Sequence, residues 1–199
     1  MIKEYILDNS INIIKKKYEL NEENIEVIRY GLEGIYLTLT KAIIITLIAI
    51  NLNLLSEYLI FLLFYNIIRT FSFGLHAKNS IVCLISSTII FICVPMMCKF
   101  INIDTSVRIL LSIVTTLCIF LFSPADTEKR PIISKKRRLF YKIISTFISI
   151  IYSIIGLTIK NLFISNALIF ALIVQCFIIN PLSYKVFNLP YNNYKNYKE

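Results

Sequence analysis

One histidine and one cysteine are the residues of this chain best suited to do chemistry. His76 is the only histidine, and Cys83 follows it seven positions later in the stretch RTFSFGLHAKNSIVC, residues 69–83. A cysteine attacks acyl carbons as a thiolate, and a nearby imidazole or a helix N-terminus makes that form available at neutral pH. The pair therefore predicts nucleophilic acyl chemistry. The alternative is an inert interfacial histidine and a cysteine that only packs.

The chain between these two residues decides whether they can meet. In one continuous helix, His76 and Cys83 would lie roughly 10 Å apart, which is beyond hydrogen-bond reach. Gly74 permits a turn before the histidine, and Asn79 or Ser80 can cap a new helix. We therefore expect the chain to turn through residues 74–79 and restart as a helix. Cys83 would then lie in the first helical turn, near the positive end of the helix dipole.

Other catalytic classes lack the residues they need. A single histidine excludes the H-E-x-x-H zinc proteases, and none of the four glycines opens a G-x-S-x-G or P-loop motif. The three aspartates lie outside the apolar runs, which disfavours a paired aspartyl site inside a membrane. We therefore expect neither a metal nor a cofactor. The remaining cysteines have no disulfide-scaffold spacing and are predicted to be free packing residues: Cys93, Cys98, Cys118 and Cys176.

The elements that must position this pair are membrane-spanning helices. The chain has 199 residues, 57% hydrophobic content and a mean hydropathy of +0.71, which is too apolar for a soluble globule. The predicted fold is therefore all-α, a polytopic helical bundle in the cell membrane. Six runs are long and apolar enough to span a bilayer: 35–51, 54–72, 80–98, 106–122, 140–158 and 161–180.

A more polar region precedes the first span. Apolar residues recur at helical spacing through 7–18 and again through 25–35, which predicts two amphipathic helices. These helices either lie on the cytoplasmic membrane surface or form a small cap packed on the spans. The predicted domains are the amphipathic N-terminal helices (1–34), a transmembrane domain (35–185) and a polar cytoplasmic tail (186–199), whose end we expect to be frayed.

The positive charges predict which side of the membrane each loop faces. With six spans, 17 Lys and Arg residues fall on the side of the N-terminus and 3 on the other side. Cytoplasmic loops are enriched in these residues, so both termini and the His76 loop are expected in the cytoplasm. The net charge of +9 is then explained by the membrane and an acidic partner, and we expect no nucleic-acid binding.

A second polar motif, SPADTEKRPI at residues 123–132, follows the fourth predicted span and leads into a basic stretch. Its charges fit a solvated loop that obeys the positive-inside rule. They also fit a docking surface for an acidic peptide segment, because the prolines at 124 and 131 stiffen the ends of the loop. The candidate docking residues are Lys129, Arg130, Lys135 and Lys136.

These two motifs resemble those of the accessory gene regulator B (AgrB) family, membrane endopeptidases that process the precursor of a cyclic autoinducing peptide in quorum sensing. The family pattern is Arg, three residues, Gly-Gly, one residue, His-Ala, and a Cys seven positions after the His. Arg69, Gly74, His76 and Cys83 match this pattern. Phe73 replaces the first Gly, so the turn is not expected to depend on a glycine there. The family's Pro-Ala-Asp-Thr-Glu segment is matched from residue 124 onward.

The resemblance implies a reaction and a set of roles. Cys83 is the nucleophile and His76 the general base. An AgrD-like precursor is cut before its acidic C-terminal tail, and the resulting acyl-thioester on Cys83 is closed to a thiolactone or a lactone. Arg69 and Gly74 match positions that the family needs for activity, and we assign them to substrate or site orientation and to the turn.

A third catalytic group, which would orient His76, is not fixed by the motif. The candidates are Glu33, on the polar face of the second amphipathic segment, and Asp126, in the second motif; the alternative is that both are plain surface carboxylates. The expected partners are the precursor, membrane lipid and, by the same resemblance, a second copy of the chain. Two competing interpretations give Cys83 no role: a small peptide transporter or export channel, and a scaffold for a signalling kinase.

Overall fold

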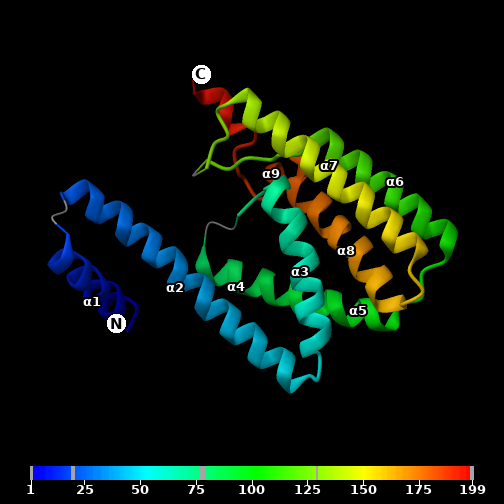
Figure 1. Cartoon of the computed structure of the whole chain (residues 1–199), viewed down its shortest axis with the longest axis horizontal. Coiled ribbons are helices and arrows are strands. Elements are labelled where there is room, and N and C mark those ends of the chain that lie inside the picture. The colour runs from blue at the N-terminus through cyan, green and yellow to red at the C-terminus, as the bar shows by residue number, and fades with distance from the viewer. Residues whose placement is uncertain (1, 19–20, 77–78, 129, 198–199) are drawn as a thin grey trace. The chain divides into compact units, whose positions relative to one another are not determined.

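The computed structural model describes residues 2–18, 21–76, 79–128 and 130–197 (Figure 1). Within these ranges the chain forms helices and two isolated β-bridges, without a named strand, which confirms the predicted all-α class. The helices are α1 (Ile2–Lys17), α2 (Glu22–Asn51), α3 (Leu55–Ser72), α4 (Ser80–Thr88), the π-helix η1 (Ile89–Cys93), α5 (Val94–Phe100), α6 (Thr105–Phe122), α7 (Lys135–Thr158), α8 (Leu162–Ile179), α9 (Pro181–Val186) and the 3₁₀-helix η2 (Asn193–Asn196).

In the described part of the chain, five helical segments are long and apolar enough to cross a membrane: α2, the run α4–η1–α5, α6, α7 and α8. The predicted count of six spans is therefore corrected to five. The difference is α3, whose Glu57, Asn66 and Arg69 make it the most polar of the six predicted runs. α3 nevertheless belongs to the bundle, since its Phe61 and Ile68 are fully buried.

The chain divides into two compact units, Met1–Ile48 and Ala49–Glu199. In the second unit α8 is the central helix, and it contacts α3, α5, α6 and α7 (Figure 1). Its apolar residues surround the whole helix, as expected of a helix buried inside a bundle. The outer helix α6, by contrast, exposes Leu110, Leu117 and Leu121. Apolar side chains on the outside of such a bundle indicate contact with lipid.

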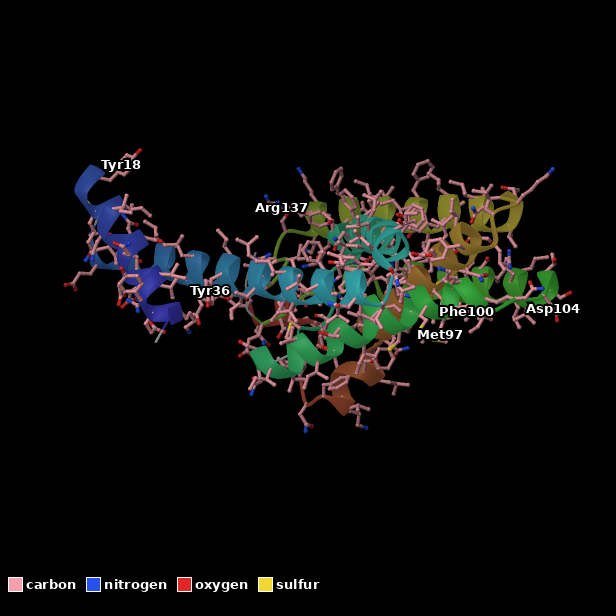
Figure 2. All side chains as sticks on the ribbon, turned by 90° about the horizontal axis from the view of Figure 1, so that it is seen from below. Tyr18, Tyr36, Met97, Phe100, Asp104 and Arg137 are labelled. Carbon is pink, nitrogen blue, oxygen red and sulfur yellow. The ribbon has the colours of Figure 1, made fainter. Side chains whose placement is uncertain are left out.

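The second unit has two ends of different composition. We name the end formed by residues 69–76, 122–128, 130–138 and 175–180 the site end. At the opposite end, the Lys99 ammonium lies 2.7 Å from the Glu57 carboxylate and joins α5 to α3. Figure 2 shows Arg137 and Asp104 at these opposite ends. Both motifs of the sequence therefore lie at the same end of the bundle, although about fifty residues separate them.

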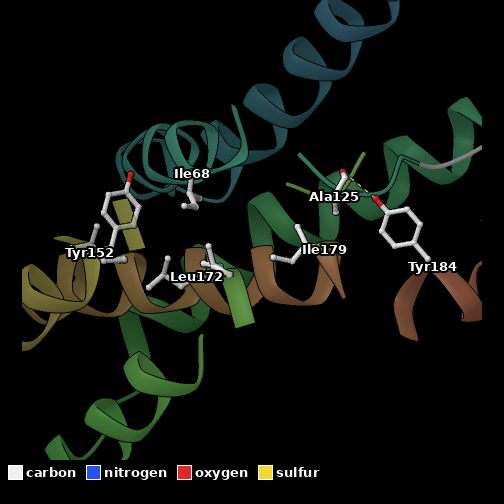
Figure 3. Packing of buried hydrophobic residues seen from close by; sticks show 8 residues of the cluster. Ile68, Ala125, Tyr152, Leu172, Ile179 and Tyr184 are labelled. Atoms are coloured by element: carbon white, nitrogen blue, oxygen red, sulfur yellow. Dashed lines mark hydrogen bonds between the residues drawn. The ribbon is translucent and has the colours of Figure 1, made fainter. Parts of the chain in front are cut away.

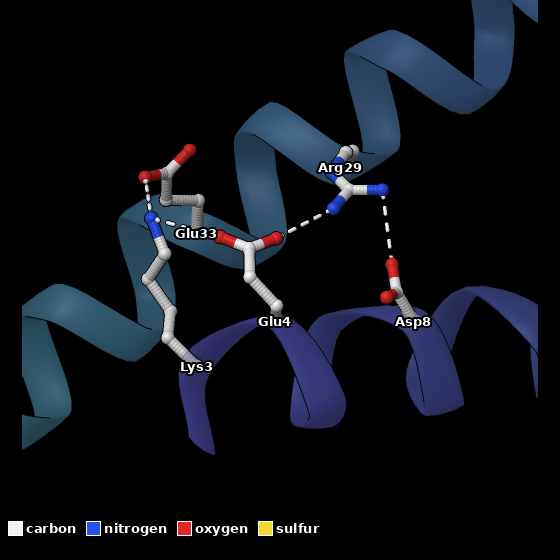
Figure 4. A network of polar contacts seen from close by, with 5 residues as sticks. All are labelled: Lys3, Glu4, Asp8, Arg29 and Glu33. Atoms are coloured by element: carbon white, nitrogen blue, oxygen red, sulfur yellow. Dashed lines mark hydrogen bonds and ion pairs between the residues drawn. The ribbon is translucent and has the colours of Figure 1, made fainter. Parts of the chain in front are cut away.

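In the first unit, α1 pairs with α2 through side chains that are half-exposed or exposed (Figure 4). Apolar contacts support the pairing, since Leu7 and Ile11 of α1 are buried. α2 continues without a break through the predicted junction at residues 34–35. The ion pairs are Lys3 with Glu33 and Glu4 (2.7 and 3.4 Å) and Arg29 with Glu4 and Asp8 (2.7 and 3.0 Å).

The C-terminal segment (residues 181–197) folds against the site end. Asn180 caps α9, because its side chain accepts a hydrogen bond from the Leu182 N–H at 2.9 Å. Further along, Tyr184 and Asn193 are 1% and 2% exposed. The expectation of a frayed end was therefore wrong for the described residues up to Tyr197, because polar groups of this segment have buried partners in the loop after α6.

Candidate active site

Arg69 shapes the turn that leads from α3 to His76. Its Nη1 donates to the carbonyl of Phe73 at 2.6 Å, and its Nη2 donates to the carbonyls of Gly74 and Leu75 at 3.2 and 2.7 Å. The end of a helix leaves carbonyls without partners, and a planar guanidinium can bind several of them at once. In this structure Arg69 therefore holds the backbone turn that leads to His76.

Gly74 has no room for a side chain. Its φ of +118° is a backbone conformation that favours glycine. An added Cβ would lie 2.5 Å from Arg69 Nη1 and 2.6 Å from Ile178 Cγ2. The predicted assignment of Gly74 to the turn is consistent with both the backbone conformation and this close packing.

Phe73 also adopts a conformation typical of glycine, with φ +57° and ψ −138°. The turn therefore has a glycine-like backbone conformation at the position where the family pattern has its first glycine, although the residue here is a phenylalanine. Such strain costs about 1–3 kcal/mol and persists only where surrounding contacts offset it. Here the phenyl ring packs edge-on against Tyr141, with the ring centroids 4.9 Å apart.

The second motif is hydrogen-bonded to this turn. The Ala125 N–H donates to the Ser72 carbonyl at 3.0 Å, and the Gly74 N–H donates to the Ala125 carbonyl at 2.7 Å. These bonds form a parallel β-bridge between Phe73 and Ala125. The two sequence motifs are thus parts of one hydrogen-bonded unit.

Helix α8 supplies two contacts that sequence reasoning missed. Gln175 is fully buried, and its Nε2 donates to the Phe73 carbonyl at 2.8 Å. Three residues later, the Ile178 carbonyl accepts the Leu75 N–H at 3.2 Å. The sequence feature that could have indicated the Gln175 contact is a glutamine within an apolar run, because an amide inside a membrane helix needs a polar partner.

The predicted helix restart before Cys83 is confirmed, and the described part of the predicted turn, residues 74–76 and 79, lies between α3 and α4. His76 is exposed directly after the turn, and Cys83 is half-buried at the end of the first turn of α4. Asn79 is the cap: its side chain accepts the Ile81 N–H at 2.8 Å, and its carbonyl accepts the Cys83 N–H at 2.9 Å. Ala77 and Lys78 lie outside the described residues.

The two candidate carboxylates have different surroundings. Asp126 is 3% exposed, and its carboxylate accepts three backbone N–H groups, those of Ile132, Asn193 and Tyr194 at 3.3, 2.9 and 2.8 Å. These bonds hold the loop after α6 against the C-terminal segment. Glu33 lies in the first unit, where it accepts a hydrogen bond from Lys3 Nζ at 2.7 Å (Figure 4).

A groove of about 750 Å³ opens beside the turn at the site end. Its aromatic part is formed by Phe73 and Tyr141. Phe73 directly precedes Gly74, so the groove borders the turn. The cations on its other side create a surface that attracts anions. Those cations, all exposed, are Arg130, Lys135, Lys136 and Arg137. Lys129, the other predicted docking residue, lies outside the described residues.

The five cysteines are free thiols in the structure. Cys98 is fully buried, whereas Cys93 lies exposed in the π-helical segment η1. Among the residues that the structure describes, no group of three His, Cys, Asp or Glu side chains is placed to hold a metal ion. The chemistry that these residues can perform is acyl transfer to a thiol with an imidazole as proton carrier.

The family model described as accessory gene regulator B matches residues 7–179. The chain belongs to this family. A protein of Clostridium acetobutylicum named as AgrB-like is 29% identical over 187 residues, which cover 93% of this chain and 90% of the relative. An AgrB-like protein of Listeria welshimeri is 32% identical over 188 residues, with 94% and 91% covered. One of Lactiplantibacillus plantarum is 30% identical over 175 residues, with 84% and 86% covered.

Membership in the AgrB family confirms the resemblance read from the two motifs and gives the chain a role in the accessory gene regulator system. The matched range includes both motifs and ends at Ile179, before the C-terminal segment begins. No solved structure matches this chain.

Proposed function

We propose that this AgrB-family chain is a membrane cysteine endopeptidase that removes the C-terminal tail of an AgrD-like autoinducing-peptide precursor. The observation that carries the proposal is the pair of backbone bonds between the His76 turn and Ala125, which gathers both family motifs beside a cationic groove. A histidine and a cysteine that merely packed would need neither a strained turn nor a second segment to hold it.

In the proposed reaction, His76 takes the proton from the Cys83 thiol. The position of Cys83 in the first turn of α4 supports this step, because the positive end of the helix dipole stabilises a negative sulfur. The thiolate attacks the carbonyl carbon at the cleavage site. His76 then returns the proton to the departing amine, and the shortened precursor stays bound to Cys83 as a thioester.

The second step closes the ring. A thiol or hydroxyl within the bound precursor gives its proton to His76 and attacks the thioester carbonyl. Cys83 leaves as the thiolate, and a thiolactone or lactone is released. Water would hydrolyse the thioester if it reached the site freely. A site at the surface of a helical membrane bundle limits that access and so favours cyclisation.

We assign the acidic tail of the precursor to the cationic groove. Arg130, Lys135 and Lys136 line it together with Phe73, which belongs to the turn itself. A tail bound there would lie next to the segment that carries His76. Opposite charges at such a surface increase the rate of encounter and select the partner. By its place in the same basic sequence, Lys129 is assigned to the same surface.

The site end is proposed to face the cytoplasm, with both chain termini on that side of the cell membrane. This requires α3, which runs from the Glu57–Lys99 pair to the turn at the site end, to cross the membrane inside the bundle in addition to the five apolar segments. The loops of the site end and the tail folded against it carry most of the basic residues of the second unit, which is the bias expected of cytoplasmic segments.

We further assign the chain a second copy of itself and membrane lipid as partners, as the family resemblance implies.

The test is co-expression of the full chain with a precursor peptide, followed by mass spectrometry of membranes. Wild type is expected to remove the C-terminal tail and to carry a hydroxylamine-labile peptide adduct on Cys83. Cys83→Ala and His76→Ala should abolish both signals. Cys93→Ala is the matched control, because it removes an exposed thiol elsewhere on the chain and should process normally. Equal processing by wild type and Cys83→Ala would overturn the proposal and favour a transporter.

A further inference from the structure

The C-terminal segment reaches the site end through one buried carboxylate. Asp126 Oδ1 accepts the Asn193 N–H at 2.9 Å, and Oδ2 accepts the Tyr194 N–H at 2.8 Å. A buried carboxylate is stable only when its oxygens have such donors. Both donors are main-chain groups, so the contact requires the segment to be present and correctly folded, whichever side chains it carries.

A second contact comes from Tyr184, which is 1% exposed (Figure 3). Its hydroxyl donates to the carbonyls of Ala125 and Asp126 at 3.3 and 3.1 Å. Burial raises the pKa of Tyr184 above its ordinary value, so the hydroxyl keeps its proton and remains a donor. The ring packs edge-on against Tyr191 of the same segment, with centroids 5.0 Å apart.

The carbonyl that Tyr184 contacts is the one that holds the turn. Ala125 O accepts the Gly74 N–H at 2.7 Å as well as the Tyr184 hydroxyl. The Ala125 carbonyl therefore links the C-terminal segment to Gly74, and His76 follows Gly74 by two residues. On the far side of the loop, the Arg138 guanidinium lies 3.8 Å from the centre of the Tyr194 ring and also donates to the Ile132 carbonyl.

From these contacts we propose that the C-terminal segment is a positioning part of the active site, acting through Ala125 and Asp126 on the turn that carries His76. This inference rests on the proposed peptidase function. It assigns positioning roles to Tyr184 and Asp126, and it extends the working site past Ile179, where the family match ends.

Positioning matters here because proton transfer between His76 and Cys83 needs heavy atoms about 2.6–3.2 Å apart. A shift of about 1 Å in a reacting group lowers the rate roughly 100-fold. A loosened turn should therefore lower kcat while the cationic groove, built mainly by α7 and the residues before it, still binds the precursor. It should also change the environment of Cys83 in the absence of any substrate.

The experiment compares full-length wild type with Tyr184→Phe and Asp126→Asn. The matched control is Tyr152→Phe, which also removes a buried tyrosine hydroxyl, one that donates to the Phe64 carbonyl within the bundle at 3.0 Å. For each variant we would measure kcat and KM for precursor processing. We would also measure the pH dependence of Cys83 alkylation by iodoacetamide, read by mass spectrometry of the peptide that contains Cys83.

Tyr184→Phe and Asp126→Asn are expected to lower kcat about tenfold or more and to shift the midpoint of the alkylation profile. KM should change by less than about threefold in Tyr184→Phe, whereas Asp126 also accepts the N–H of Ile132, which lines the groove. Tyr152→Phe should leave kcat, KM and that midpoint as in wild type. The inference is overturned if Tyr184→Phe and Asp126→Asn match the control in all three measurements.

The two proposals fail in distinguishable ways. If wild type shows no Cys83-dependent processing, the peptidase assignment is wrong. In that case the alkylation profile still decides whether the C-terminal segment controls the surroundings of Cys83. If wild type processes the precursor and the Tyr184→Phe profile is unchanged, the peptidase assignment stands and the positioning role is wrong.

Discussion

Gly74 offers the most direct test of the turn, because alanine adds a single carbon to it. That carbon would lie 2.5 Å from Arg69 Nη1 at a backbone φ of +118°, so either the guanidinium or the backbone must move. For Gly74→Ala we expect processing to fall at least about tenfold and the free energy of unfolding to fall by about 1–3 kcal/mol. Quantitative mass spectrometry of the precursor and thermal unfolding in detergent measure the two effects.

Gly31→Ala is the control for this substitution. Gly31 lies in α2 with nothing within 4 Å of its would-be Cβ. Alanine is favoured over glycine in a helix by about 1 kcal/mol, so this variant should process normally and be no less stable than wild type. Normal processing by Gly74→Ala would show that the turn tolerates a different conformation from the one described.

Residues around His76 could be predicted where they act on neighbouring positions of the sequence. Gly74 and Asn79 act within a few positions of the histidine: the turn at Gly74 was predicted, and Asn79 was one of the two predicted caps. Gln175 and Tyr184 were missed because each contacts the turn, directly or through Ala125, from about a hundred residues away. A lone glutamine in an apolar run indicates that it needs a partner without indicating which one.

At the scale of elements, the pairing of α1 with α2 should depend on pH. Hydrogen bonds from Arg29 and then Lys3 hold the pKa of the Glu4 carboxyl below its ordinary value. Since this pKa is lower in the folded state, the carboxylate stabilises the pair above its unfolded pKa, and the contribution is lost as pH falls through the folded pKa. We expect α1 to lose protection against hydrogen exchange below about pH 4.

Mass spectrometry of the full chain measures this protection, after correction for the intrinsic pH dependence of exchange. The loss should be only severalfold, because exposed ion pairs contribute little. In Arg29→Met, protection of α1 should already be lower at neutral pH, and the further loss in acid should be smaller than in wild type. An identical acid response in Arg29→Met and wild type would contradict a role for this pair.

Helix positions followed from apolar patterning to within a few residues, but α3 shows where patterning stops being informative. The middle of α3 is largely apolar, while Glu57 and Arg69 near its ends contact Lys99 and the backbone turn. These charges lower the mean hydropathy of α3, and hydropathy alone does not indicate that each charge has a partner inside the protein. The π-helical segment η1 was likewise invisible to a period count, since it lies inside one apolar run.

For the whole molecule, the two ends of the second unit should face opposite sides of the membrane. The end opposite the site carries few cations, so the positive-inside rule assigns it to the outside. In intact cells, a membrane-impermeant maleimide should label Asp104→Cys and Lys160→Cys. It should label Glu128→Cys, an exposed position of the site end, only after the membrane is permeabilised.

Wild type, with its five native thiols, supplies the background for this labelling. Labelling of Glu128→Cys in intact cells, together with protection of Asp104→Cys, would mean that the site faces outward. The peptide would then have to cross the membrane before it is cut.

The contacts of Ala125 and Asp126 also set an order of events during biosynthesis. A ribosome completes His76 and Cys83 early, but the partner carbonyl of the turn comes some fifty residues later, and the N–H groups that hold Asp126 come from residues 193 and 194. Chains emerge N-terminal first, so a nascent or prematurely terminated chain contains His76 and Cys83 without the contacts that hold the turn. On the proposed positioning role, a chain that lacks residues 193 and 194 should process a precursor more slowly than one that contains them.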